Sequence, residues 1–266
     1  MDSIVELEHV HVARGSSMIL HDLSLRIHSG EHLAILGPNG CGKSTLLKTI
    51  TCELYPLVRP ETSVRIMGRE RWDLTQLKRR MGVVAAELPG RQTLSITGLD
   101  AILTGFFSSS TLWPNLVVTN KMRERAEEIL KLVNAESLRS ALVGEMSAGQ
   151  QRRIMIGRAM AGTSSEVEQG SVQMLLLDEP SNALDLAAQQ DLREMLRGLA
   201  HRGTAIVLIT HHIADILPEI DRIVMMKDGC IVADGSKKEL LTGDHLHKLF
   251  GREITLVERD GYWNAW

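Results

Sequence analysis

Apolar and polar residues alternate along two segments near the start of the chain. Residues 4–12 and 19–27 carry an apolar side chain at about every second position, which is the spacing of a strand with one buried face. Gly15 with the two serines after it, and the pair Ser29-Gly30, supply turns behind these segments. The pattern therefore predicts antiparallel strands at the N-terminal side of the chain.

Short, unbroken apolar runs follow, and they alternate with segments of helical character. Such runs are typical of strands that are buried on both faces of a parallel sheet. We predict strands of this kind at residues 32–36, 172–177 and 204–210, and further short strands at 64–68 and 81–84. Two strands around an Asp-Gly turn are predicted at 223–235, and helices at 186–200 and after residue 210.

A different pattern covers the chain from about Leu88 to Gly162, where strand-like runs are absent. Residues 121–133 place their apolar side chains on one face of a helix. We interpret this stretch as an α-helical insertion within a sheet-based domain. Residues 162–171 are mostly polar, and we predict that they form a surface loop. The tail from residue 245 predicts a helix and a strand at 254–257, without indicating a function.

Composition limits the possible functions. Hydrophobic residues make up 44% of the 266 residues and charged residues 24%, as in ordinary soluble globular proteins. The net charge of −3 does not support a nucleic-acid-binding surface, so no direct nucleic-acid partner is expected. Three cysteines without metal-ligand spacing indicate a reducing compartment. Because no apolar run approaches the roughly 20 residues of a membrane span, we expect a cytoplasmic protein unless a partner holds it at a membrane.

The first candidate site is a glycine-rich loop between a predicted strand and a predicted helix. Gly37, Gly42, Lys43 and Ser44 match the pattern of glycine, four residues, glycine, lysine, then serine or threonine. Inward backbone N–H groups and the helix N-terminus bind a phosphate chain, while Lys43 serves the β- and γ-phosphates and Ser44 the Mg²⁺ ion. A ligand-free turn does not require lysine and serine in register. The predicted nucleotide site comprises Gly37, Pro38, Asn39, Gly40, Cys41, Gly42, Lys43, Ser44 and Thr45.

Two later segments become informative beside this loop. The apolar run 174–177 ends at Asp178 and Glu179; we predict that Asp178 holds Mg²⁺ through its water shell and that Glu179 polarises the attacking water. Ser147 and Gln150 are spaced as a capping box, and the N-terminus of such a helix is an anion site. Taken alone, each segment has an ordinary structural explanation, namely a buried strand with a solvated end and a capped surface helix.

Taken together with the segments 181–185 and 210–211, the order and spacing of these motifs resemble the nucleotide-binding domain of ABC ATPases from about residue 4 to residue 241. The resemblance implies an α/β fold: a P-loop NTPase core with a mostly parallel sheet, an antiparallel β subdomain at the N-terminal side and an inserted α-helical subdomain. It places the core at about 1–87 and 168–241 and the helical subdomain at about 88–165, in a single domain. The extension at 242–266 has no assigned role.

The resemblance also implies roles for individual residues. ATP and Mg²⁺ are the expected ligands, with Lys43, Glu179 and the switch histidine His211 as catalytic residues. Residues 146–150 match the signature loop, with methionine for the usual leucine and alanine for one glycine. The family geometry is a head-to-tail dimer around two ATP, formed with a second copy or a related ATPase. Contacts to nucleotide across the dimer are expected from Ser147, Gly149, Gln150 and, in the loop that couples the two sites, Asp185. His212 is expected to be a surface residue.

The sequence departs from the family pattern at two positions. Arg14 stands about where an aromatic ring usually contacts adenine, and its guanidinium plane offers stacking instead. Ala86 stands where a glutamine usually meets Mg²⁺ and senses the partner. Either Glu87 next to it replaces the glutamine as a metal ligand, or Glu87 is exposed and the link is missing.

Cys41 lies inside the phosphate loop near Lys43 and a helix N-terminus. These neighbours predict a lowered thiol pKa, although a small residue that merely fits the loop is the simpler explanation. Alkylation of this thiol is expected to inhibit the protein, and ATP to protect it.

The resemblance implies the ATPase subunit of an ABC transporter, bound to integral membrane permease subunits on the cytoplasmic face of the membrane. Residues 104–114 lie where family members receive a coupling helix, although Phe106 and Phe107 equally fit the core of the insertion. The sequence leans towards importers of iron or molybdenum complexes. The alternative is a non-transport ABC ATPase that acts on a cytosolic macromolecule. Cargo, direction and membrane partner are not encoded in this chain.

Overall fold

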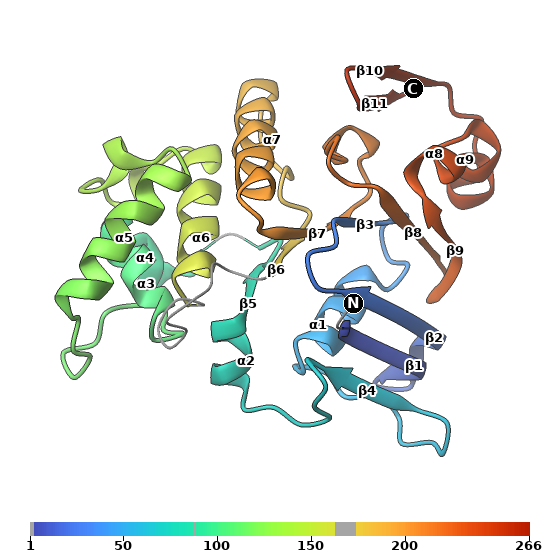
Figure 1. Ribbon diagram of the computed structural model, residues 1–266, viewed down its shortest axis with the longest axis horizontal. Coiled ribbons are helices and arrows are strands. Elements are labelled where there is room, and N and C mark those ends of the chain that lie inside the picture. The colour runs from blue at the N-terminus through green and yellow to red at the C-terminus, as the bar shows by residue number, and fades with distance from the viewer. Residues whose placement is uncertain (1–2, 88, 163–173) are drawn as a thin grey trace. The chain divides into compact units, whose positions relative to one another are not determined.

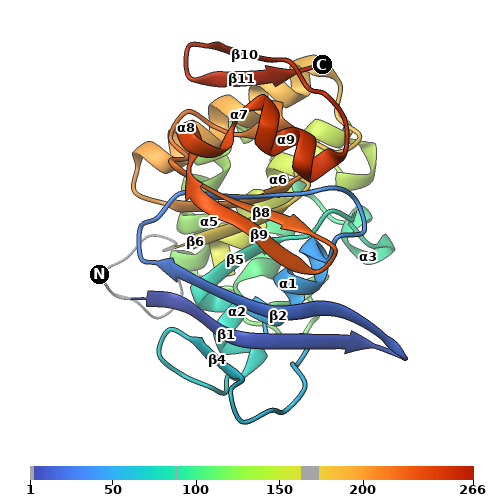
Figure 2. The same cartoon turned by 90° about the vertical axis from the view of Figure 1, so that its right-hand side faces the viewer.

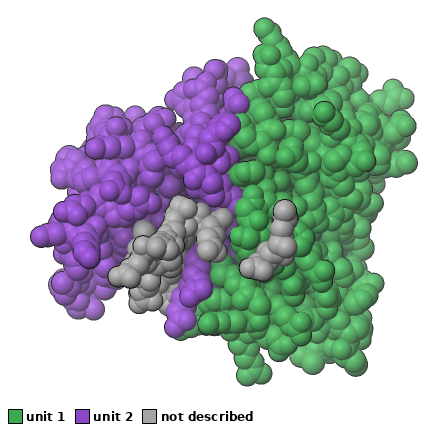
Figure 3. Space-filling view, in the orientation of Figure 1, with its two compact units in different colours: residues 1–74, 206–266 green, residues 75–205 purple. Residues whose placement is uncertain are grey.

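The computed structural model describes residues 3–87, 89–162 and 174–266. Its chain divides into two compact units, which Figure 3 shows in separate colours: unit 1 comprises residues 1–74 and 206–266, and unit 2 comprises residues 75–205. Most of the loop expected at 162–171 and the first two residues of the strand expected at 172–177 lie outside the described residues. Within the described ranges, no helix combines the length and the apolar character needed to cross a bilayer.

Unit 1 begins with a three-stranded antiparallel sheet in the order β2-β1-β4 (Figure 2). β1 buries Val5 and Leu7 at alternate positions and, after an irregularity at His9 (φ +49°), Val10 and Val12. The predicted N-terminal antiparallel strands are confirmed. The strands are β1 (Ser3–Arg14), β2 (Ser17–His28) and β4 (Ser63–Ile66).

The second sheet of unit 1 is largely parallel, and its central strands β3 and β7 are buried along their whole length. β3 (Leu33–Leu36) pairs in parallel with β7 (Ala205–Thr210) and β8 (Arg222–Lys227), and β8 pairs with β9 (Cys230–Ser236) in antiparallel fashion. The predicted Asp-Gly turn joins β8 to β9. Helix α1 (Lys43–Ile50) follows β3.

The helix predicted after residue 210 is wrong, because the structure has only a single 3₁₀ turn there, η3 (Ile213–Asp215). The backbone is already extended at Ile216 (ψ 112°), and Pro218 prevents a helix from resuming, since a proline disfavours the helical region for the residue before it. A short loop of residues 216–221 then leads to β8.

The last part of unit 1 contains two short helices and a hairpin (Figure 1). The predicted helix is α9, and the strand predicted at 254–257 overlaps the first half of β10. β10 pairs with β11, which the sequence did not indicate. The elements are α8 (Lys237–Leu240), α9 (Gly243–Phe250), β10 (Leu256–Arg259) and β11 (Tyr262–Ala265).

Unit 2 holds two parallel strands and most of the helices. β5 (Met81–Val84) pairs with β6 (Met174–Asp178). α6 packs on β5 and, with α4 and α5, forms a helical bundle. Gly105 permits this packing, because a Cβ there would lie 2.1 Å from the Arg158 carbonyl oxygen. The helices are α2 (Leu74–Arg80), α3 (Arg91–Leu94), α4 (Gly98–Gly105), α5 (Asn120–Leu132), η1 (Glu136–Leu138), η2 (Val143–Glu145), α6 (Ala148–Gly162) and α7 (Leu186–His201).

The helical character predicted from Leu88 to Gly162 is confirmed for the residues that the structure describes there, since none of them forms part of a strand. α5 spans Asn120–Leu132, within one residue of the predicted 121–133, and buries Ala126, Ile129 and Leu130 on one face. Thr119 caps it by accepting the Met122 backbone N–H, which fixes where the helix begins.

Candidate functional site

The phosphate loop lies between β3 and α1 in unit 1, where two of its glycines are sterically required. A Cβ at Gly37 would lie 2.3 Å from the Met226 carbonyl oxygen, and the Gly37 N–H donates to the Thr210 carbonyl at 3.3 Å. Gly42 has φ +103°, and a Cβ there would lie 2.8 Å from the Leu20 side chain. The loop is therefore pressed against β2 and β8 at its two ends, which fixes its path.

Lys43 is the first residue of α1, and its ammonium group is inside the loop. The side chain is buried, and Nζ donates to the carbonyl oxygens of Gly37 (2.7 Å) and Pro38 (3.1 Å). Ser44 is exposed. Since the first turn of α1 has no acidic residue, nothing in that turn offsets the positive end of the helix dipole. Lys43 and the helix N-terminus together make an electropositive, phosphate-sized loop.

The turn between β8 and β9 supports the phosphate loop, which sequence reasoning did not anticipate. The Gly229 N–H donates to the Cys41 carbonyl oxygen at 3.0 Å, and the Gly229 carbonyl accepts the His21 N–H at 3.0 Å. Gly229 has φ +78°, and a Cβ there would lie 2.2 Å from the Ile19 carbonyl oxygen. The Asp-Gly pattern predicts only a turn, whereas its glycine also permits this close contact.

Cys41 contradicts the predicted lowering of its thiol pKa. The side chain is 4% exposed, and burial raises the thiol pKa more than the nearby Lys43 charge lowers it. A thiolate loses its hydration in such a place, so the neutral thiol is favoured. Cys41 is thus a small residue that fits the loop.

Arg14 ends β1 on the surface. It pairs with Ser17 across the turn at Gly15, and its side chain is exposed. Contact of its guanidinium group with adenine stays a prediction.

The signature helix in unit 2 confirms the predicted capping box. The Ser147 hydroxyl accepts the Gln150 N–H at 3.3 Å, and the Gln150 side-chain oxygen accepts the Ser147 N–H at 2.9 Å. The first turn of α6 has no acidic residue. Gly149 lies against α7, where a Cβ would be 2.8 Å from the Ala188 Cβ. The N-terminus of α6 is therefore ordered and suited to an anion.

The carboxylates of Asp178 and Glu179 lie at the end of β6, and both side chains are buried, at 5% and 8% exposed. Glu179 has φ +46°. A non-glycine residue in the left-handed region costs about 1–2 kcal/mol, and such strain tends to occur at functional sites. Asp185, the exposed coupling-loop residue, caps α7 by accepting the Ala188 N–H at 2.8 Å.

Arg152 of α6 holds the backbone at the position of the missing glutamine. Its guanidinium group donates to the carbonyl oxygens of Ala85 (2.7 Å) and Ala86 (3.1 Å). Burial lowers the pKa of Arg152, and the Asp178 charge counteracts that shift. No local sequence pattern indicates this link, because Arg152 and Ala85 are 67 residues apart in the chain.

Ala86 is half-buried and Glu87 is exposed. Glu87 lines a cavity of about 420 Å³ in unit 2, together with Pro89, Arg91 and Arg158. The exposed side chain agrees with the second of the two alternatives for Glu87, while a role in metal binding stays a prediction.

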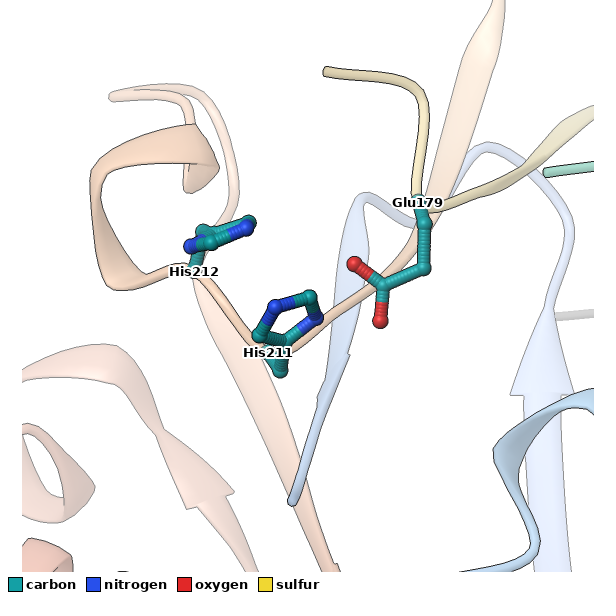
Figure 4. A group of neighbouring side chains, drawn as sticks. All are labelled: Glu179, His211 and His212. Carbon is teal, nitrogen blue, oxygen red and sulfur yellow. The ribbon is translucent and has the colours of Figure 1, made fainter. Parts of the chain in front are cut away.

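His211 and His212 follow β7 directly, and Glu179 follows β6 (Figure 4). The two imidazole ring centroids are 3.8 Å apart. Thr210 orders the loop: its hydroxyl donates to Asp215 at 3.1 Å and accepts the His212 N–H at 3.0 Å. His211 is half-buried and His212 is exposed, which confirms the expectation that His212 is a surface residue.

Comparison with known proteins agrees with this geometry. The family described as "ABC transporter" matches residues 20–182. The hemin import ATP-binding protein HmuV of Burkholderia thailandensis is 33% identical to this chain, over 96% of each protein. The protein of the same name from Aliivibrio fischeri is 30% identical over 92% of this chain and 88% of its own length.

Solved structures show the same fold and confirm the predicted α/β class. A metal-chelate type ABC transporter in an inward-facing conformation superimposes with a TM-score of 0.78, at 22% identity over 99% of this chain and 96% of that one. The ADP conformation of MJ1267, an ATP-binding cassette, gives a TM-score of 0.80 at 24% identity, over 95% of this chain and all of the other. The chain therefore belongs to the ABC transporter family, as an ATP-binding subunit that hydrolyses ATP to drive transport.

Proposed function

We propose that this chain is the ATPase subunit of an importer of hemin or a closely related iron complex, and that it acts at the cytoplasmic face of the membrane. The observation that supports this cargo is the shared name of the relatives. They are hemin import ATP-binding proteins at 28–33% identity over at least 92% of this chain. The expected iron or molybdenum complexes include this class of cargo. The proposed direction of transport, import, rests on the names of the same relatives.

The phosphate loop is the proposed site of the ATP phosphates. Lys43 supplies a buried ammonium group for the β- and γ-phosphates, and backbone N–H groups of the phosphate loop bind the phosphate chain. Ser44 and Asp178 offer hard oxygen ligands of the kind that Mg²⁺ prefers, so the residues fit this ion, which neutralises charge on the phosphates when it is bound. Glu179 is the proposed general base for water, and His211 the contact to the γ-phosphate.

A dimer is proposed because the chain has two separate helix N-termini suited to phosphate. One is at Lys43 behind the phosphate loop, and the other is at Ser147 in the signature segment. In a head-to-tail dimer, each nucleotide is held by the phosphate loop of one protomer and by the α6 N-terminus of the other. Binding of ATP then favours the closed pair, and hydrolysis releases it.

The cavity of about 420 Å³ in unit 2 is the proposed contact for a membrane permease. Ser110 forms part of its lining, and the neighbouring Ser109 carbonyl accepts a hydrogen bond from Arg158 at 3.0 Å. Arg158 therefore holds the middle of the segment 104–114 at one wall of the cavity. Phe106 is not available for docking, because it is only 2% exposed.

The test is uptake in cells that lack the gene and are given hemin as their only iron source. The wild-type gene is expected to restore growth, and a Lys43→Ala gene is not, because the phosphate contact is lost. A ferric siderophore supplied in parallel measures cargo selectivity. Equal growth on hemin with and without the wild-type gene refutes the proposed cargo.

A further inference from the structure

The C-terminal segment of unit 1 and the loop after β7 border a solvent-open cavity of about 430 Å³. This volume lies within the roughly 300–1,000 Å³ of small-molecule sites. β11 packs against η3, and Gly261 in the hairpin turn lies close to Pro218, with 3.0 Å between a Cβ placed there and the proline Cβ. The segment is therefore held against the loop that carries His211 and His212.

The hairpin that forms part of the cavity is closed by backbone pairing. Thr255 and Trp266 exchange two hydrogen bonds, at 3.0 and 3.2 Å. At the other end of the segment, the Lys227 ammonium group donates to the Lys248 carbonyl at 2.6 Å and ties α9 to β8. The cavity wall is thus ordered on both sides of Gly251, where α9 ends.

The lining combines aromatic surface with groups that bind metals and carboxylates. Phe250 and Trp266 offer ring faces, and Ile254 adds aliphatic surface. Arg252 offers a guanidinium group, which binds carboxylates through two parallel hydrogen bonds. His212 offers an imidazole, a common ligand of iron.

The His212 ring is more accessible to a ligand than the ring of its neighbour His211, which is half-buried. Its ring is exposed, and within the part of the chain that the structure describes the ring makes no hydrogen bond. Its backbone N–H donates to the Thr210 hydroxyl, which fixes the position of the His212 backbone in the cavity wall. Figure 4 shows the ring on the residue next to His211.

We propose that this cavity binds an iron tetrapyrrole with carboxylate groups, such as hemin, with His212 as an axial ligand of the iron. Phe250 and Trp266 contact the macrocycle, and Arg252 pairs with a carboxylate. This identity of the ligand rests on the proposed cargo. The bound ligand holds the segment that carries His211, the predicted contact of the γ-phosphate, so ATP hydrolysis slows when imported cargo accumulates.

The binding test is a hemin titration of the full chain, followed by the Soret absorption band. Wild type is expected to show a saturable, one-to-one band shift typical of histidine-ligated iron. The His212→Ala variant is expected to lose that shift, while His247→Ala, which changes an exposed histidine of α9 that does not line the cavity, keeps it. Iron-free protoporphyrin IX is expected to bind at least tenfold more weakly. A His212→Ala variant that retains the wild-type band overturns the proposal.

The regulatory test measures ATP hydrolysis with and without saturating hemin. Wild type and His247→Ala are expected to slow by about threefold or more, and His212→Ala to keep its rate. Equal inhibition of all three proteins would show nonspecific hemin binding and overturn the proposal, as would the absence of any inhibition.

The two proposals fail separately. Growth on hemin with no band that depends on His212 keeps the import function and overturns the cavity site. A band that depends on His212, in a protein that does not support growth on hemin, keeps the site and refutes the cargo.

Discussion

Replacing Gly229 by alanine tests whether the β8–β9 turn positions the phosphate loop. The added Cβ would lie 2.2 Å from the Ile19 carbonyl oxygen, whereas ordinary contact begins at 3.4 Å. The turn and the β2 backbone at Ile19 must therefore separate by about 1.2 Å, and we expect the exposed turn to take up most of this movement. A movement of this size lengthens the bond from the Gly229 N–H to the Cys41 carbonyl from 3.0 Å to about 4 Å, which is beyond hydrogen-bonding distance.

The expected loss of stability has three contributions. Alanine at φ +78° costs about 1–2 kcal/mol from the left-handed backbone alone. The displaced contact adds about 1–3 kcal/mol, and the lost hydrogen bond about 1 kcal/mol. Gly30 is a matched control, because it also has φ +78° but has no atom within 4 Å of an added Cβ. Gly30→Ala should therefore show only the first contribution.

The assays are urea unfolding and ATP binding by calorimetry. Gly229→Ala is expected to lose about 2–4 kcal/mol more unfolding free energy than Gly30→Ala, and its affinity for ATP is expected to fall about tenfold because the loop loses its support. Gly30→Ala should bind ATP as wild type does. Equal effects of the two substitutions in both assays would refute the steric reasoning.

Four further predictions concern the site. Glu179→Gln is expected to bind ATP and form a stable dimer by gel filtration while losing at least a hundredfold in hydrolysis; full activity would refute its role as the base. Ser147→Ala is expected to lower the free energy of unfolding by about 1 kcal/mol and to reduce the ATPase rate by more than this loss of stability explains. If only the stability falls, Ser147 acts as a helix cap and does not contact the nucleotide. Because burial raises the pKa of Cys41, its thiolate fraction at pH 7.5 is below that of free cysteine. Alkylation should therefore be slower than that of glutathione, accelerate as pH rises and be blocked by ATP, whereas rapid, pH-independent labelling would contradict the burial argument. Arg14→Ala should reduce affinity for ATP and GTP about equally if the guanidinium stacks on the base, and unchanged affinities would show that Arg14 makes no such contact.

Local patterns predicted most of the elements, because strands, helices and caps depend on neighbours in the sequence. The strand at 81–84, the α5 helix and the pairing of Ser147 with Gln150 follow from periodicity or spacing alone. The helix expected after residue 210 does not form, because the backbone becomes extended at Ile216 and Pro218 prevents the helix from continuing. β11 was missed because a short segment of mixed residues becomes a strand only through its partner β10.

The candidate site likewise has features that the sequence predicts and features that depend on the folded structure. The glycine and lysine positions of the phosphate loop are readable from sequence, since backbone geometry and charge demand those residue types. The pKa of Cys41 was predicted in the wrong direction, because a neighbouring lysine is visible in the sequence and burial is not. The contact of Gly229 with Cys41 joins segments far apart in the chain, so no local pattern reports it.

The guanidinium group of Arg152 has a mechanical consequence for unit 2. Its donors are fixed in one plane, so the Ala85 and Ala86 carbonyl oxygens must follow any rotation of α6 if both hydrogen bonds are kept. The main chain at these positions then transmits the orientation of the signature helix to the segment leading to Glu87. This linkage is indifferent to the side chain at position 86 and depends on the planarity of one arginine, for which a lysine with a single ammonium group is no substitute.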